Sequence, residues 1–238
     1  MTLTGYLIIA GVLTLSACLQ ASIGFGMAML AAPVVAVVDP SLVPGTLIIQ
    51  AGLLTLFVTV AERRHIDLRG TGWALVGRVP GTVAGALLVA ALPPRGLALM
   101  LSGVVLLGVV LTCFGWTPRP HRPTLVLAGS ASGLLGTATS IGGPPMALVW
   151  QGKDAPVLRG TMSGFFLIGS VLSVVTLAPT GAMGPHTLLT SLLLAPAPAL
   201  GYVLSRYVNR FLDARRLRWA AIGVSTLGAV LLIGAQLA

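Results

Sequence analysis

The chain has 238 residues, of which 56% are hydrophobic and only 8% are charged. A soluble domain carries charge on about a quarter of its residues, so this composition excludes an ordinary water-soluble protein. The formal net charge of +9 would suit nucleic-acid binding, but the basic residues gather in short breaks between long apolar runs. That arrangement is typical of an integral membrane protein with basic cytoplasmic loops. We therefore expect a lipid bilayer, and no nucleic acid, as its surroundings.

The apolar runs predict an all-α polytopic membrane protein. Most runs contain about 19–22 residues, enough to cross ~30 Å of hydrocarbon at ~1.5 Å per residue. Three of them, at 25–38, 123–137 and 141–150, are shorter and suit half-helices or re-entrant segments. In chain order, the expected segments are 3–21, 25–38, 42–61, 71–92, 95–116, 123–137, 141–150, 157–178, 186–204 and 215–236.

The basic loops predict how the chain is threaded. Placing the loop at 62–70 in the cytoplasm also places 119–122, 153–159 and 205–218 there, and leaves only Arg95 outside. This is the distribution that the positive-inside rule favours. It predicts a multi-pass protein of the cytoplasmic (inner) membrane with both termini outside and no soluble domain.

An internal repeat divides the chain into two halves, 1–118 and 119–238. Three pairs of matches occur in order, at offsets of 118, 115 and 116 residues: Ser22-Ile23-Gly24 with Ser140-Ile141-Gly142, Asp39 and Gly45-Thr46 with Asp154 and Gly160-Thr161, and Pro80 and Gly85 with Pro196 and Gly201. In the expected threading, Asp39 is outside and Asp154 inside, and the turn at 93–95 is outside while its counterpart near 206–218 is inside. The sequence therefore predicts two inverted-topology repeats of about five helical segments each, as in many secondary transporters.

Each half contains a Gly-rich interruption of its hydrophobic pattern, at Gln20–Met27 and at Thr137–Met146. Glycine weakens a helix, and Pro144-Pro145 cannot continue a helix but can begin the next one. We expect an unwound tip at each motif, followed by a free helix N-terminus near Met27 and near Pro145 that attracts anions. The alternative interpretation is that the small residues only allow helices to pack closely.

The segments Gly24-Phe25-Gly26 and Gly142-Gly143-Pro144-Pro145, together with the duplicated plan, resemble the sulfite exporter TauE/SafE family of membrane transporters. The resemblance covers essentially the whole chain. It implies transport of small sulfur-containing anions, such as sulfite, sulfonates or sulfoacetate, with export as the direction. The inverted repeats predict alternating access around a site near the midplane. The family is functionally broad, so the substrate does not follow from the resemblance alone.

The candidate substrate-binding residues lie in or beside the two motifs, or are uncharged polar residues in the spans. They are Gln20, Ser22, Gly24, Phe25, Gly26, Gln50, Thr139, Ser140, Gly142, Gly143, Pro144 and Pro145. For Gln20 and Gln50, an interhelical hydrogen bond is an equal alternative to lining the substrate path. Arg78, about two turns into 71–92, either attracts anions into an inner vestibule or extends to the interface, and we favour the interface.

The acidic residues and histidines predict no catalytic centre, cofactor or metal site. Every acidic residue lies in or beside a loop, and the three histidines are scattered near membrane boundaries: Asp39, Glu62, Asp67, Asp154, Asp213, His65, His121 and His186. An enzyme is therefore not expected. A structural or assembly subunit of a membrane complex, which would carry no flux alone, is the alternative to a transporter. The oligomeric state, with a homodimer as one option, is left open.

Overall fold

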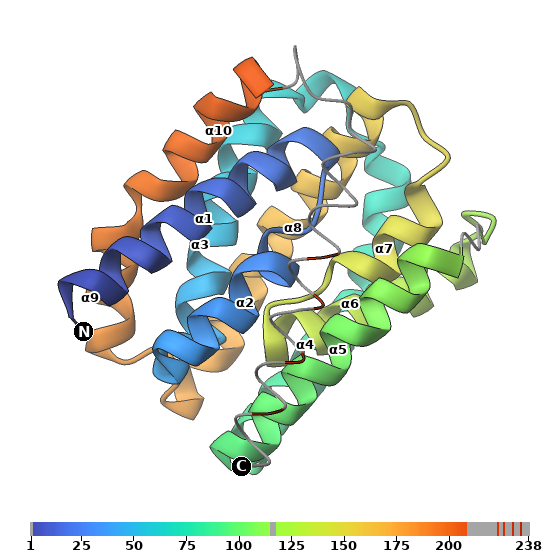
Figure 1. Cartoon of the computed structure of the whole chain (residues 1–238). Helices are drawn as coiled ribbons and strands as arrows, with labels where there is room; N and C mark the ends of the chain where they lie inside the picture. The colour runs from blue at the N-terminus through green and yellow to red at the C-terminus, as the bar shows by residue number, and fades with distance from the viewer. Residues whose placement is uncertain are drawn as a thin grey trace.

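The structure is a computed structural model that describes residues 2–114 and 118–208, together with residues 223, 226, 230 and 234. The described part folds into α-helices joined by short loops and 3-10 turns (Figure 1). In chain order these are α1 (Leu3–Ile23), α2 (Met27–Val38), η1 (Pro40–Leu42), α3 (Gly45–Ala61), η2 (Arg63–His65), α4 (Leu68–Ala91), α5 (Pro94–Phe114), α6 (Arg122–Thr139), α7 (Gly143–Trp150), α8 (Ala155–Leu177), η3 (Ala178–Thr180), α9 (Pro185–Leu194) and α10 (Pro196–Val208).

These helices confirm the predicted segments between residues 3 and 178 to within a few residues at each end. The predicted segment 186–204 is instead divided into α9 and α10 at Ala195. The cause is Pro196, which has no N–H to donate and whose ring crowds the carbonyl four residues earlier. The predicted last segment, 215–236, lies outside the described residues except at four isolated positions.

Several helices have the length and surface of membrane spans. Within the described residues, four helical stretches are long and apolar enough to cross a bilayer: Leu3–Ile23, Leu68–Ala91, Ala155–Thr180 and Pro185–Val208. Their outer faces carry large exposed side chains, including Leu87 (65% exposed) and Leu192 (71%). Large exposed apolar surface is unfavourable in water but suits contact with lipid tails. The protein is therefore an integral membrane protein, and its described residues form an all-helical fold.

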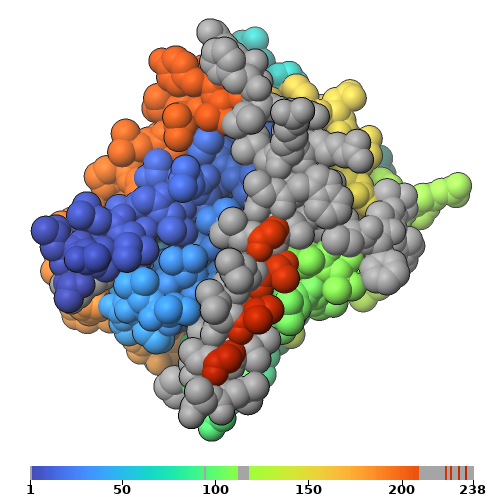
Figure 2. Space-filling view, in the orientation of Figure 1, coloured from blue at the N-terminus to red at the C-terminus, as the bar shows by residue number. Residues whose placement is uncertain are grey.

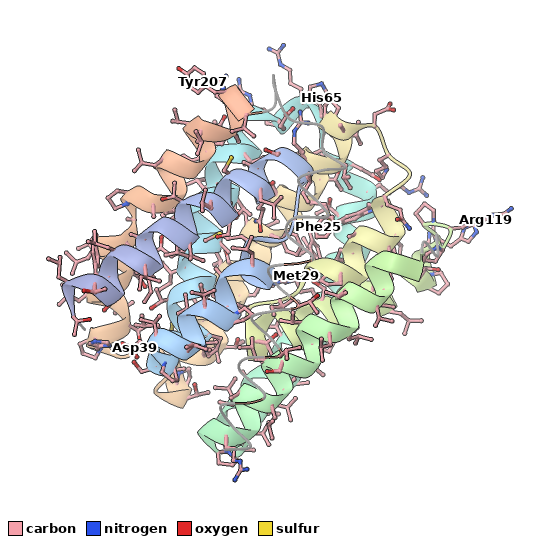
Figure 3. The ribbon with its side chains drawn as sticks, in the orientation of Figure 1. Phe25, Met29, Asp39, His65, Arg119 and Tyr207 are labelled. Atoms are coloured by element: carbon pink, nitrogen blue, oxygen red, sulfur yellow. The ribbon has the colours of Figure 1, made fainter. Side chains whose placement is uncertain are left out.

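The charged loops gather at one end of the bundle, which we call the basic end. Figure 3 shows His65, Tyr207 and Arg119 along the upper and right edge, and Asp39 at the opposite, lower left edge. The 17 residues of α3 connect the two ends, a rise of about 25 Å at ~1.5 Å per residue. We call the second end, which also holds Pro93 and the loop at 178–184, the Asp39 end.

Two ion pairs at the basic end join the loop between α3 and α4 to the region around the start of α8. Glu62 accepts hydrogen bonds from Arg159 at 2.7 and 3.2 Å, and Lys153 Nζ lies 2.9 Å from Asp67 Oδ2. Burial by itself would raise the pKa of Asp67, but hydrogen bonds from the Gly70 N–H and from Lys153 bring that pKa below its ordinary value. The Asp67 carboxylate therefore stays charged at neutral pH, and its pair with Lys153 persists.

Three extensive helix pairs hold the described bundle together: α4 with α6, α1 with α10, and α3 with α8. Figure 2 shows blue α1 against orange α10 on the surface. Glycines bring the first two pairs into backbone contact. A Cβ added to Gly77 or Gly81 would overlap the carbonyls of Val126 or Ser130 on α6, and one added to Gly201 would overlap the Thr14 carbonyl on α1. Such contact is typical of membrane helices, which gain stability from close packing.

We predict that Gly81→Ala destabilises the protein whereas Gly72→Ala on the same helix does not. The added methyl at Gly81 would overlap the Ser130 carbonyl, whereas nothing lies within 4 Å of a Cβ at Gly72. Overpacking costs about 1–3 kcal/mol, while an unhindered Gly→Ala change in a helix gains ~0.5–1 kcal/mol. Thermal unfolding in detergent, followed by fluorescence, should give a lower midpoint for Gly81→Ala only. Equal midpoints for the two variants would contradict the described α4–α6 contact.

Candidate functional site

The first predicted interruption is present. Helix α1 ends at Ile23, and Gly24 and Gly26 have φ values of +94° and +111°, in the left-handed region that glycine adopts without strain. These two positions turn the chain back towards the Asp39 end, and α2 begins at Met27. The predicted unwound segment between two helical arms is thus confirmed, and the two glycines are required by the backbone conformation.

The second interruption is also present, at residues 140–142. Helix α6 ends at Thr139, Ser140 has a φ of +67°, and α7 begins at Gly143 with Pro144 and Pro145 in its first turn. Side-chain oxygens stabilise this turn: Ser140 Oγ donates to the Pro44 carbonyl at 3.0 Å, and Thr139 Oγ1 accepts from the Ile141 N–H at 3.3 Å.

The predicted free helix N-terminus at Met27 is occupied at one of its donors. The Met27 N–H donates to Gln20 Oε1 at 3.0 Å, so the side chain of Gln20 caps α2. At α7, Pro144 and Pro145 have no N–H, so its first turn has two fewer donors than an ordinary helix start. An anion site in this protein therefore has to rest on other groups as well.

Each interruption contacts the start of a long helix in the other half of the chain. A Cβ added to Gly24 would lie 3.5 Å from Arg159 Cα, in the first turns of α8. Ser140 contacts Pro44, which directly precedes α3. The first interruption thus faces the basic end and the second faces the Asp39 end.

Both interruptions border one central cavity of about 50 Å³. Liquid water occupies ~30 Å³ per molecule, so the space suits a ligand of only a few heavy atoms. Figure 3 shows Phe25 and Met29 near the middle of the bundle, and both line the cavity. The predicted site residues on its wall are Gln20, Phe25, Gly26, Ser140, Gly142, Gly143 and Arg78.

Arg78 does not extend to the interface, which corrects the interpretation favoured from the sequence. It is only 4% exposed and lies on the cavity wall. Its Nη1 donates to Ser132 Oγ at 3.1 Å, and its guanidinium carbon lies 4.7 Å from the centre of the Phe165 ring. These partners belong to α6 and α8, so tertiary packing directs the side chain inward.

Several predicted site residues lie elsewhere. Gln50 donates to the Ser191 carbonyl at 2.7 Å, so it makes the interhelical hydrogen bond that was its alternative role. Ser22 donates to the Cys18 carbonyl within α1. Neither these two residues nor Gly24 and Thr139 line the central cavity. Pro144 and Pro145 line a separate, mainly apolar cavity of about 340 Å³ beside α5 and α6.

Helix α8 also contributes to the cavity wall, which was not predicted from the sequence. Phe166, Ser170 and Ser173 line the cavity from this helix, and Ser173 Oγ shares a hydrogen bond with Thr137 Oγ1 at 2.8 Å. Their spacing of four and three residues places them on one helix face, a signal present in the sequence. The other wall residues that were not predicted are Ala28, Met29, Ile48, Ala51, Gly136 and Ile141.

The cavity combines a cation, hydroxyl groups and backbone at the interruptions, which suits binding of an anion. Across residues 2–114 and 118–208, no cluster of three His, Cys, Asp or Glu side chains is present that would hold a metal ion. The ion pairs in the same part of the chain all lie at the basic end. The described acidic groups therefore do not neutralise Arg78 through an ion pair.

The family comparison agrees with the described architecture. The model of the sulfite exporter TauE/SafE family matches residues 7–232, which is nearly the whole chain. No curated protein and no solved structure matches the chain at a significant level. The chain therefore belongs to the sulfite exporter TauE/SafE family, a family of membrane transporters rather than enzymes.

Proposed function

We propose that this protein exports small sulfur-containing anions, such as sulfite or sulfonates, across the cytoplasmic membrane. Family membership supports transport of this kind. The observation that carries the proposal is the central cavity, which is bordered by both helix interruptions and contains the buried Arg78. Polar and ionisable groups inside a membrane protein mark substrate paths, because placing them there is costly.

We propose further that the halves 1–118 and 119–238 are inverted repeats that move relative to each other in alternating access. The reciprocal packing supports this. In the repeat, α6 is the expected counterpart of α1, and α4 is the expected counterpart of α9–α10. Helix α1 packs against α10, and α6 correspondingly packs against α4. The contacts Gly24–Arg159 and Ser140–Pro44 are reciprocal in the same way, because residues 44 and 159 are 115 positions apart. A binding site between such repeats is typical of secondary transporters.

Export requires no coupling ion under this proposal. With the basic end in the cytoplasm, an inside-negative potential drives an anion outward by ~2.3 kcal/mol per charge per 100 mV. The described acidic residues Asp39, Glu62, Asp67 and Asp154 lie at or beyond helix ends, where none is placed to relay a cation through the middle of the bundle. Uniport is therefore the simplest mechanism for the proposed activity.

The proposed threading predicts the labelling of single cysteines by a membrane-impermeant thiol reagent. In a chain whose two native cysteines are replaced by alanine, Ser41→Cys and His186→Cys should react in intact cells. Gly152→Cys and His65→Cys should react only after the membrane is opened. All four positions are exposed, and each side is tested from both halves. Labelling of a basic-end cysteine in intact cells would reverse the proposed orientation.

The proposed cavity predicts that filling it stops transport. Ala51 lines the cavity from α3, whereas Ala61 is exposed at the end of the same helix. Ala51→Leu should lower the flux about tenfold or more, because the larger side chain occupies space that the anion needs and a binding loss of ~1.4 kcal/mol is a factor of ten. Ala61→Leu should leave the flux unchanged.

Flux is measured in liposomes that contain only the purified chain, with sulfite, sulfonates, thiosulfate and simple carboxylates, with and without an imposed voltage. Flux of a sulfur anion that rises with voltage supports the proposal. No flux of any anion in the panel would instead favour a structural subunit of a membrane complex. Equal flux in Ala51→Leu and the unaltered protein would show that transport does not use this cavity.

A further inference from the structure

Arg78 is a buried cation for which the described structure provides little compensation. It is 4% exposed, and its Nε has no hydrogen-bond partner. Within the described part of the chain, Glu62 and Asp67 pair with other residues at the basic end, and Arg78 makes no ion pair. An unpaired charge inside a membrane protein is costly, so a residue in this state calls for a ligand of opposite charge.

The guanidinium group is nevertheless held firmly in place. Ser132 Oγ accepts from Arg78 Nη1 at 3.1 Å and donates to the Gly142 carbonyl at 2.7 Å. The rings of Phe165 and Phe166 lie 4.7 and 5.8 Å from the guanidinium carbon, within the range of a cation–π interaction. Ser132 thus connects the charged group to the second interruption, while the two rings support it from α8.

Gly169 provides the space for the guanidinium group. A Cβ added at this position would overlap Arg78 Nε, the guanidinium carbon and Nη2. On the same helix, a Cβ added to Gly164 would make only ordinary contacts, 3.5 and 3.6 Å from the side chain of Ile66. The chain therefore has a matched pair of glycines, only one of which controls the position of Arg78.

We propose that Arg78 binds the transported anion directly, that Ser132 and Gly169 are positioning residues for it, and that the site selects oxyanions with a single negative charge. The inference rests on the proposed transport function. A guanidinium group favours oxyanions because its planar set of donors matches their oxygens. Since the described wall of the cavity contains one cation and no acidic residue, a monoanion is neutralised there, whereas a dianion leaves a buried net charge.

Methanesulfonate and sulfate test the charge selectivity, because both are tetrahedral sulfur oxyanions. Sulfate has a fourth oxygen, and with it a second negative charge, where methanesulfonate has a methyl group. In liposomes, the unaltered protein should transport methanesulfonate at least about tenfold faster than sulfate, the factor that corresponds to ~1.4 kcal/mol. Equal rates would overturn the monoanion inference even if both anions are transported. Absence of flux for every anion in the panel would instead overturn the proposed function.

Variants test the role of Arg78 itself. Arg78→Met should lower the methanesulfonate flux by at least about 100-fold, while Arg78→Lys should keep transport with a raised half-saturation concentration, because it retains the charge but loses the fork of donors. If Arg78→Met does not fold, Arg78→Lys still decides: an unchanged half-saturation concentration, and an unchanged preference for methanesulfonate over chloride, would overturn the assignment. Normal flux in a folded Arg78→Met variant would overturn it as well.

Further variants test the positioning residues. Ser132→Ala should raise the half-saturation concentration about tenfold, the effect of losing a hydrogen bond to a charged group, and Ser132→Thr should restore it. Gly169→Ala should resemble Arg78→Lys, with weaker binding and a smaller preference for methanesulfonate over chloride, and Gly164→Ala should behave like the unaltered protein. Anion preference identical in Gly169→Ala and Gly164→Ala would refute the positioning role.

Discussion

In a bilayer, a helix can stop only where other groups satisfy the backbone polar atoms that the helix leaves unpaired. This protein stops a helix twice in its interior, and side chains pair with backbone groups at each stop. Gln20 accepts a hydrogen bond from the first N–H of α2, and Thr139 accepts one from the Ile141 N–H. Ser132 donates to the Gly142 carbonyl. With these bonds in place the two interruptions border a cavity, and the rest of the bundle is arranged around it.

Close helix packing keeps that cavity in the interior. Glycines of α4 bring its backbone into contact with α6, and Gly201 of α10 brings its backbone into contact with α1. Helices α3 and α8 pack together and contribute Ile48, Ala51, Phe166 and Ser170 to the cavity wall. The small residues therefore have both of the roles that the sequence suggested, close helix packing and interruption of helices. Some of them let helices approach, and Gly24 and Gly26 adopt the left-handed conformation at the first interruption.

The described spans and both interruptions were predictable because each depends on local sequence. Apolar length defines a span, and Gly24, Gly26 and Pro144 mark where helices cannot continue. The contents of the site depend on tertiary contacts and were less predictable. Nothing near Gln20 in the sequence indicates that it caps α2. Arg78 is two turns from a loop, a distance compatible with either direction, and its inward direction follows from Ser132 and Phe165, which are 54 and 87 positions away in the chain.

The matching prolines Pro80 and Pro196 have different outcomes. Pro80 lies inside the continuous helix α4, whereas Pro196 begins α10 after an interruption at Ala195, which keeps helical dihedrals (φ −55°, ψ −31°). A bend at Ala195 breaks few additional hydrogen bonds, because that turn has already lost part of its backbone ladder. Pro80 also removes one hydrogen bond from α4, but the helix continues without interruption on both sides of it. If the proposed inverted repeat holds, these two counterparts differ in stiffness, because the α9–α10 stretch can bend at Ala195 with fewer broken hydrogen bonds than α4.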